Sequence, residues 1–517
     1  MMRALHIFEP NHTSLSVCTF ILVGAMLALL AACSDTAGKL STVSRAHYDN
    51  QLVIAARQDT LNFLESRNSK AHVVPLREGA TALASRLDAI DHANKTLDIS
   101  LFILREDDAG HLFVHKVLAA ADRGVKVRLL FDDLFNRHTA RSFLALGEHA
   151  NIEVRIFNPY ARITPTSVSF ILNYEQSRRR MHSRFQIADG THAIIGGRNI
   201  ADEYFADNGN SHFLDFEVSL RGKSVLAFTN AFEVYWNDPW SKPLSEIQVL
   251  PSTLDVDRLR RLTDQRAKNA LLGKYRAIAQ TASAGPKEPK GMRAELSVIS
   301  DDPAKLRNQE SRGPFLVSQS HFDEIAAAKK RVLIVTPYFI PTEAGARLLE
   351  KLSAREIQVE VVTNSLASTN HTSVHGGYVE YRTRLLRAGV KIFELKPHTK
   401  SQHSDVNPKR TLHSKYTVID GSKTIVTTMN FDPISLTGNL ETSALIRSQP
   451  FARKMLKHVT SMTLNDCYGL QLDENGTLVW HERSGSTRIE FSDEPEAALG
   501  RHFISDLISI MNIEGML

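Results

Sequence analysis

The alternation of apolar and polar positions predicts the same order of elements twice along the chain. In the first half, LDISLFIL from Leu97 predicts a strand, GHLFVHKVLAAADRG predicts an amphipathic helix that ends at Gly124, and VKVRLLF predicts the next strand. In the second half, RVLIVTPYFI from Arg331, EAGARLLEKLSARE and IQVEVVTN repeat that order. Strand, helix and strand in tandem predict α/β layers around a parallel sheet.

Three further stretches frame this repeat. Residues 45–76 predict a helical lead-in, and the run from Lys268 to Lys290, with its GPKEPKG cluster, predicts a connection that is helical in its first part. RHFISDLISIMNIEGML, near the end of the chain, has apolar residues at helical spacing, and we favour packing on the core over membrane contact. The expected division is a signal peptide at 1–32, a lead-in at 33–75, a first half at 76–265, a connection at 266–292 and a second half with a C-terminal helix at 293–517.

The first residues carry an export pattern. Val17 to Leu30 is apolar except for Thr19, and the run ends in Leu-Ala-Ala-Cys at Cys33, as in bacterial lipoprotein signals. We expect cleavage before Cys33 and acylation of that residue; the alternative is an uncleaved anchor, since residues 15–32 are nearly long enough to span a bilayer. Both interpretations predict a membrane tether, and the first predicts a periplasm-facing lipoprotein of the inner or outer membrane.

Net charge limits the classes of partner that we expect, and cysteine content indicates what stabilises the fold. The chain has 62 Lys and Arg against 57 Asp and Glu, a net charge of +5, which is mild for a nucleic-acid binder, so no nucleic-acid partner is expected. The basic run Arg178 to Arg180 is interpreted either as a guide for an anionic backbone or phospholipid, or as a solvated loop. Only Cys467 lies inside the expected domains, so the folded chain must rely on its core and not on an internal disulfide.

Two segments share one pattern of polar residues, MHSRFQIADGTHAIIGGRN and LHSKYTVIDGSKTIVTTMN. In each, a His is followed by a cation, an Asp and an Asn at the same spacing. The apolar run FQIA or YTVI after the cation predicts a buried strand, in which alternate residues share a face. An imidazole beside a cation suits a nucleophile or proton donor that meets a phosphate. The residues are His182, Arg184, Asp189 and Asn199, and His413, Lys415, Asp420 and Asn430.

The repetition of the pattern distinguishes its residues from isolated polar residues elsewhere in the chain. Because the whole constellation occurs twice, we assign chemistry to its histidines, whereas isolated residues such as His212 and His371 receive none. Asp189 and Asp420 each precede a Gly, so turn formation and an indirect catalytic role are both open for them. The sequence contains no H-E-x-x-H or paired C-x-x-C motif, and we predict neither a metal nor a cofactor.

The doubled pattern resembles the signature of the phospholipase D superfamily, H-x-K-x4-D followed by G-G/S-x-N, which is present twice per active site. The GGRN motif that ends at Asn199 fits it, and NFDPIS, which begins at Asn430, is similar to the NLDPRS of cardiolipin synthases. The flanking sequences match as well, so the resemblance covers most of the chain and is nearest to bacterial cardiolipin synthase C-like proteins. The chain departs from the pattern where Arg184 replaces Lys and where Thr427 and Thr428 replace the second Gly pair.

This resemblance implies a fold and a mechanism. The fold is a duplicated phospholipase D fold, with two α/β/α-layered halves that share one active site at their interface. One His, assigned as His182, attacks phosphorus to give a phosphohistidine, and His413 protonates the leaving alkoxide. The cations and Asn amides hold the non-bridging oxygens, without a metal. An acidic residue downstream of each His orients it, and the matching residues are Asp215, with Glu217 as its alternative, and Glu441.

The implied activity is that of a membrane-tethered phosphatidyltransferase. Its expected substrates are phospholipids of the phosphatidylglycerol or phosphatidylethanolamine class. Alternatives are a hydrolase that releases phosphatidic acid, and a phosphodiesterase or nuclease of the same superfamily. Arg184 keeps open an inactive phospholipid-binding protein, because Arg grips phosphate in a bidentate manner but does not lose its proton. The acceptor alcohol and the oligomeric state stay undecided.

Overall fold

The computed structural model describes the two repeated halves but not the chain's ends. The expected signal peptide, Cys33, most of the lead-in, residues 279–290 of the connection and nearly all of the C-terminal apolar stripe lie outside the described residues. Within the described part, no helix is both long and apolar enough to cross a membrane. The described residues are 69–136, 139–160, 174–206, 211–247, 253–276, 278, 291–307, 316–398, 409–484, 487–498, 500–502 and 505.

The first half begins with alternating strands and helices and ends with antiparallel strands. The strands of the alternating part are parallel, as the sequence predicts, and the later strands extend the same sheet. The alternating part is β2 (Thr96–Leu101), α4 (Asp108–Asp122), β3 (Lys126–Asp132), α5 (Ala140–Gly147) and β4 (Ile152–Phe157). The antiparallel part is β6 (Phe185–Ala188), β7 (His192–Gly196) and β9 (Glu217–Arg221).

The second half repeats this plan. Its first three strands are again parallel, and three antiparallel strands continue the sheet. The alternating part is β12 (Arg331–Val335), α14 (Thr342–Ala354), β13 (Gln358–Asn364), α15 (Thr372–Arg387) and β14 (Lys391–Leu395). The antiparallel part is β16 (Tyr416–Ile419), β17 (Lys423–Thr427) and β19 (Thr442–Arg447). The duplicated α/β fold is therefore confirmed.

Two central strands join the halves into one continuous sheet. Strand β1 (Ser69–Leu76) pairs with β9 on one side and with β11 (Met292–Ser300) on the other, and β11 pairs with β19. The prediction of a helix is wrong for residues 69–76. Pairing on both edges and full burial of Val73 and Leu76 outweigh local helix propensity there. At the outer edges lie β10 (Ser241–Pro243), and β20 (Cys467–Leu472), β21 (Leu478–Ser484) and β22 (Thr487–Phe491).

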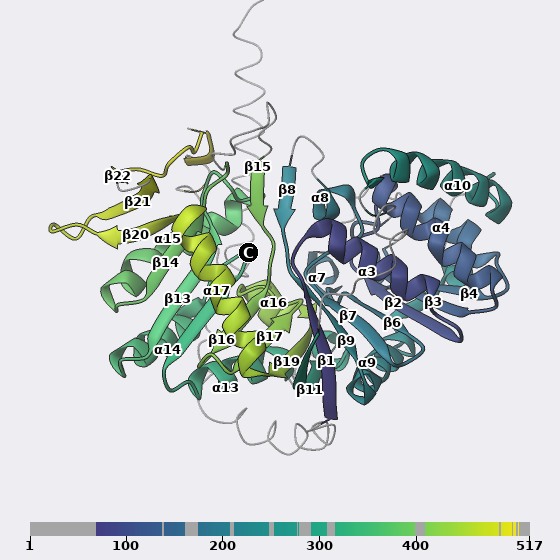
Figure 1. Ribbon diagram of the computed structural model, residues 1–517, viewed down its shortest axis with the longest axis horizontal. Helices are drawn as coiled ribbons and strands as arrows, with labels where there is room; N and C mark the ends of the chain where they lie inside the picture. Colours follow the sequence, from purple (N-terminus) through teal and green to yellow (C-terminus); the bar gives the residue numbers. More distant parts are fainter. Residues whose placement is uncertain are drawn as a thin grey trace, which may run out of the picture. The chain divides into compact units, whose positions relative to one another are not determined.

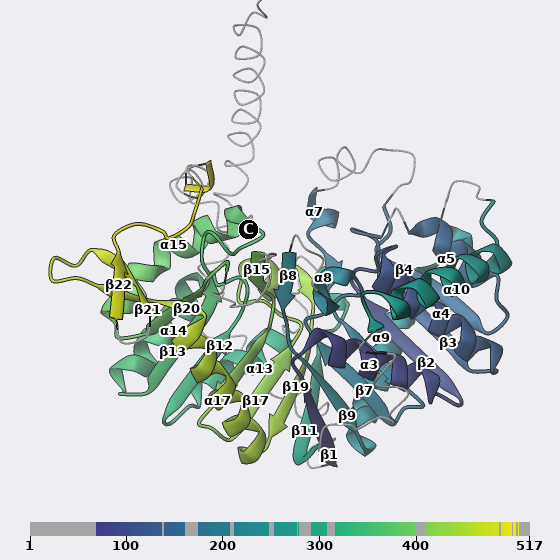
Figure 2. The ribbon, with the colours of Figure 1, turned by 45° about the horizontal axis from the view of Figure 1, so that its top comes forward.

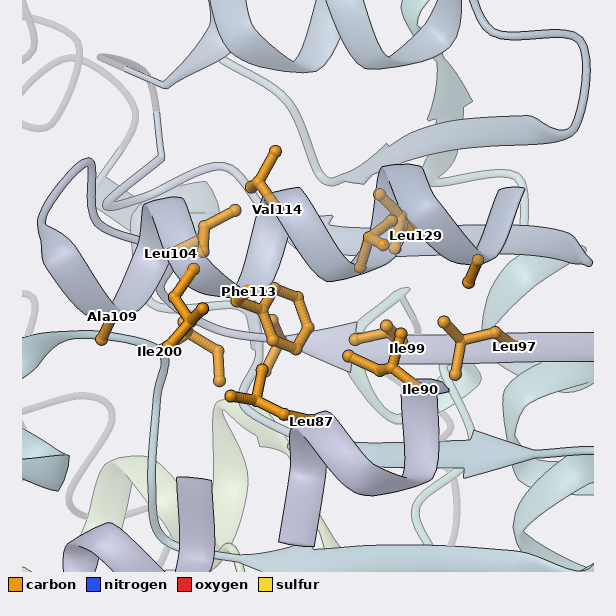
Figure 3. Close-up of a cluster of buried hydrophobic side chains, with 14 of the residues drawn as sticks. Leu87, Ile90, Leu97, Ile99, Leu104, Ala109, Phe113, Val114, Leu129 and Ile200 are labelled. Atoms are coloured by element: carbon orange, nitrogen blue, oxygen red, sulfur yellow. The ribbon is translucent and has the colours of Figure 1, made fainter. Parts of the chain in front are cut away.

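Helices cover both faces of the sheet (Figures 1 and 2). In the first half, α3 (Gly79–Asp91), α4 and α10 (Val256–Leu272) enclose an apolar core in which Leu87, Phe113 and Ile99 meet, as Figure 3 shows. The opposite face carries α9 (Leu226–Trp236), and in the second half α17 (Gln449–Asn465) takes the corresponding place. The cluster that contains α9 and α17 draws side chains from both halves, so the halves share one core.

Two short parallel ladders also cross between the halves. Strand β5 (Arg180–Met181) pairs with β18 (Asn439–Leu440), and β8 (Ser211–Leu214) pairs with β15 (Lys409–Leu412). The second ladder is visible between the halves in Figures 1 and 2. Each of these strands ends one residue before a candidate site residue. Further helices are α7 (Tyr174–Ser177), α8 (Asp202–Phe205), α12 (Ala304–Arg307), α13 (Leu316–Ala326) and α16 (Pro433–Thr437), with single 3-10 turns at Lys223–Val225 and Leu244–Glu246.

Candidate active site

The short ladders bring each His beside the acidic residue of the other half. Because β5 and β18 run parallel, the residues that follow them, His182 and Glu441, emerge side by side, and the His182 amide donates to the Leu440 carbonyl at 3.0 Å. In the same way β15 and β8 deliver His413 and Asp215, and the His413 amide donates to the Leu214 carbonyl at 2.8 Å. The expectation that each His is oriented by the acidic residue downstream of it in its own half is therefore wrong, because the parallel pairing of these short strands, which the sequence spacing does not reveal, crosses the two pairs.

His182 lies in a buried set of charged groups. Its Nδ1 is 2.8 Å from Glu441 Oε1, and the Arg184 guanidinium contacts its Nε2. Burial, and then the charge of Arg184, lower the pKa of His182 to about 4. Burial alone would raise the pKa of Glu441, but its contacts with His182 and with the Thr428 hydroxyl hold that pKa below its usual range. The imidazole is therefore neutral near pH 7, with Nδ1 oriented by a carboxylate.

His413 has a parallel environment with a different cation. Its Nδ1 is 2.5 Å from Asp215 Oδ2, and Lys415 Nζ lies 3.2 Å from each ring nitrogen. Burial, and then the charge of Lys415, lower the pKa of His413 to about 3. Burial also lowers the pKa of Lys415 to about 7. Unlike a guanidinium, this ammonium can lose its proton within the physiological range.

Asn199 connects Arg184 to a second side chain. Its Oδ1 accepts from Arg184 Nε at 2.7 Å and from the backbone N–H of Ile103 at 3.1 Å, while its Nδ2 donates to the Tyr204 hydroxyl at 2.8 Å. In the second half, Asn430 is also buried, and its Oδ1 has no hydrogen-bond partner among the described residues. The two Asn side chains therefore differ in how firmly they are held.

The departure at the second Gly pair has a structural consequence. In the first half, a Cβ on Gly197 would lie 2.3 Å from Asp215 Oδ1, and a Cβ on Gly196 would lie 2.3 Å from the Phe216 carbonyl oxygen. Only Gly fits there without moving its neighbours. In the second half, Thr428 stands at the matching position and its hydroxyl donates to Glu441. The replacement thus supplies an added hydrogen bond to the carboxylate that faces His182.

Asp189 and Asp420 lie away from the histidines, at the opposite ends of β6 and β16. Both have positive φ angles, 51° and 53°, and each is followed by a Gly that also has a positive φ, as a tight hairpin turn requires. The Asp189 carboxylate accepts backbone N–H groups at the start of β2 at 2.7 to 3.0 Å, and Asp420 accepts those before β12 at 2.8 to 3.1 Å. The structure places both at these turns and not beside the imidazoles.

Two other residues singled out in the sequence turn inward to structural partners. Glu217 is fully buried against the Arg86 guanidinium, so it is Asp215, and not Glu217, that meets His413. Arg180, from the basic run, is buried beside Asp132 at 3.3 Å and donates to the carbonyls of Gln176 and Asn158. It therefore braces the chain just before His182 instead of facing an incoming ligand.

Several residues at the site carry no sequence signal of their own. Phe102 packs edge-on against His182 at 4.8 Å between ring centroids, and Phe213 and Tyr204 lie 5.2 Å from the His413 ring. These residues lie outside the two His-containing segments, and only the fold brings them to the imidazoles. In the described part of the chain, no group of His, Cys, Asp and Glu side chains has the arrangement of a metal site.

Comparison with known proteins identifies the family. A family model described as the PLD-like domain of cardiolipin synthase matches residues 87–236 and 322–463, more than half of the chain. Cardiolipin synthase C of Escherichia coli (strain K12) is 31% identical over 86% of this chain and 95% of its own length. The chain belongs to the cardiolipin synthase type of phospholipase D-like enzymes.

A more distant relative supports this family assignment, and a solved structure supports the fold. Cardiolipin synthase B of Salmonella typhi is 24% identical over 77% of this chain and 82% of its own length. Among solved structures, the phosphatidylserine synthase of Haemophilus influenzae Rd KW20 covers 89% of this chain and 100% of its own, with a TM-score of 0.55 and 12% sequence identity. That likeness confirms the fold.

Proposed function

We propose that the protein is a phosphatidyltransferase that forms cardiolipin from phosphatidylglycerol through a phosphohistidine. The observation that supports it most strongly is the convergence of two buried His–carboxylate pairs, each with its own cation, on one interface. Such a site offers a nucleophile, an acid and fixed positive charge to one phosphodiester. The similarity to cardiolipin synthase C of Escherichia coli supports the choice of substrate.

The contacts of His182 suit the nucleophile. An N–H of Arg184 points at Nε2, which must therefore present a lone pair, and Glu441 accepts from the opposite nitrogen. In the first step, the bond from Nε2 to phosphorus forms and the bond from phosphorus to the headgroup oxygen breaks. Because Arg184 keeps its charge at all relevant pH values, it disfavours protonation of His182 and keeps the lone pair available.

The contacts of His413 suit the acid. The low pKa of His413 means that it needs a proton source, and Lys415 Nζ lies 3.2 Å from Nε2 with a pKa of about 7. A bound phosphodiester adds negative charge between the rings, which raises the pKa of His413 and favours transfer of that proton to it. His413 then protonates the leaving alkoxide, and in the second step it takes a proton from the acceptor hydroxyl, whose oxygen displaces Nε2 from phosphorus.

We also propose that a lipid on Cys33 holds the enzyme at the periplasmic face of a bacterial membrane. The support is the apolar run that ends in Leu-Ala-Ala-Cys. Fatty-acid labelling should mark the wild-type chain and fail to mark Cys33→Ala. Labelling of that variant would contradict the lipoprotein.

The proposed reaction is tested with two headgroups of different leaving ability. Wild type should convert phosphatidylglycerol in vesicles to cardiolipin and glycerol, and His182→Ala and His413→Ala should each lose at least about 10³ in rate. With a nitrophenyl headgroup, which leaves without a proton, His413→Ala should recover the first step, measured as a burst of about one nitrophenolate per site, and His182→Ala should not. Recovery by His182→Ala alone would reverse the assignment. Phosphatidic acid in place of cardiolipin would contradict the transferase.

A further inference from the structure

Tyr204 bridges the two catalytic sets. It lies on α8, is 4% exposed, and its ring stands edge-on to His413 at 5.2 Å, with 76° between the ring planes. Its hydroxyl meets Asn199, which in turn holds Arg184. The phenol oxygen is therefore connected to the cation of the first half while its ring contacts the His of the second half.

The direction of the hydrogen bond at Tyr204 is fixed by its neighbours. Asn199 Oδ1 already accepts from two donors, Arg184 Nε and the Ile103 amide, so the amide group must turn its Nδ2 toward Tyr204. The phenol oxygen is then the acceptor, and its own proton points elsewhere. Among the residues that the structure describes, none accepts a hydrogen bond from the Tyr204 hydroxyl. A buried donor held in this way is available to a ligand.

Tyr338 provides a contrast close by. It lies in the segment after β12, and its hydroxyl donates to Asn370 Oδ1 at 3.0 Å. Burial raises the pKa of both phenols well above the usual value, so each keeps its proton near pH 7. The difference is that the Tyr338 proton already has an acceptor.

We propose that the Tyr204 hydroxyl is a catalytic group that donates a hydrogen bond to one non-bridging oxygen of the reacting phosphoryl group. Its place between Asn199, Arg184 and His413 puts the proton where negative charge builds up as phosphorus gains its fifth bond. The donor belongs to one half only. The matching position, five residues after Asn430, is Ser435, whose Oγ accepts from the Asn430 backbone amide. Tyr204 would therefore make one of the two non-bridging oxygens unlike the other.

The test compares Tyr204→Phe with Tyr338→Phe in the full chain, using phosphatidylglycerol and its two phosphorothioate diastereomers in vesicles. Tyr204→Phe should lower kcat by about 10²-fold with little change in KM, as loss of one oxyanion donor does, and Tyr338→Phe should stay within about threefold of wild type. Wild type should react more slowly with one diastereomer, because sulfur accepts hydrogen bonds weakly. In Tyr204→Phe that difference should shrink.

The outcomes separate this inference from the proposed function on which it rests. Suppose that wild type makes cardiolipin. If Tyr204→Phe then keeps full kcat, or keeps the same ratio of rates between the two diastereomers as wild type, Tyr204 does not donate a hydrogen bond to the phosphoryl group. If wild type acts on no phosphodiester, the proposed function fails and this role fails with it. Thermal unfolding of both variants checks that they are folded. Should Tyr204→Phe unfold early, 3-fluorotyrosine at position 204 keeps the hydroxyl, and a rate that does not respond to its increased acidity overturns the inference.

Discussion

The two halves of the site are alike in architecture and different in chemistry. Both place a His at the end of a short crossing strand, with an acid from the other half on Nδ1. They differ in the cation, since the first half has Arg184 and the second has Lys415. The duplicated scaffold supplies two equivalent places for an imidazole. We propose that the cation sets the role of each imidazole, because Arg cannot release a proton and a buried Lys can.

The same asymmetry extends to the neighbouring positions. Gly197 lets Asp215 approach the backbone closely, whereas Thr428 donates to Glu441. Asn199 is fixed by three hydrogen bonds through its side chain, whereas Asn430 Oδ1 has no partner among the described residues. In the first half the Asn is therefore hydrogen-bonded to a permanent charge, whereas the cation of the second half can change its protonation.

Among the differences between the halves, substitution of the two cations should change the rate of phosphatidyl transfer most. Lys415→Ala should lower the rate of phosphatidyl transfer by about 10² to 10³, because His413 loses its proton source and the phosphate loses a charge. Arg184→Lys should change the rate by less than about tenfold, or ~1.4 kcal/mol of barrier, because a cation remains. Headgroup release from radiolabelled phospholipid measures both. A hundredfold gain for Arg184→Lys would show that the natural first half is impaired.

The pH dependence of kcat/KM should report the protonation of His182 and of the Lys415–His413 pair separately. Activity needs His182 without its proton, so the rate should fall as the pH drops through about 4. It also needs one proton on the Lys415–His413 pair, so the rate should fall as the pH rises through about 7. Each limb should change about tenfold per pH unit. In Lys415→Arg the break near pH 7 should be absent and the rate low throughout, and an unchanged break near pH 7 would exclude Lys415 as its source.

Substitutions in the turns at Asp189 and Asp420 should have the same effect on stability in the two halves. Asp189→Asn and Asp420→Asn should each lower the free energy of unfolding by about 1 to 2 kcal/mol, because backbone N–H groups lose a charged acceptor, with kcat unchanged. Although burial opposes it, hydrogen bonding lowers the pKa of both carboxyls. Their stabilisation is therefore present above the unfolded-state pKa and is lost as the pH falls. Denaturant unfolding and initial rates measure the two effects, and a loss of kcat in only one variant would contradict an equal structural role.

Much of the fold and of the candidate site could be predicted from the sequence, and the remaining features depend on strand pairing between distant segments. The repeated strand–helix–strand order follows from local periodicity, and the doubled pattern points to the two histidines because it is contiguous. The crossed pairing could not be predicted, because β5 with β18 and β8 with β15 are two- and four-residue ladders between distant segments. Strand β1 was missed for a similar reason, since its partners β9 and β11 are remote in sequence. Tyr204 lies on a helix too short to show a period.

The proposed mechanism specialises the two halves, with His182 as nucleophile and His413 as acid. Acid quenching during turnover of acyl-labelled phosphatidylglycerol, followed by mass spectrometry of the peptides under conditions that keep the phosphoramidate bond, locates the covalent intermediate. We expect a phosphatidyl group on the peptide that contains His182 and none on the peptide that contains His413. The intermediate on His413, or on both residues equally, would contradict it.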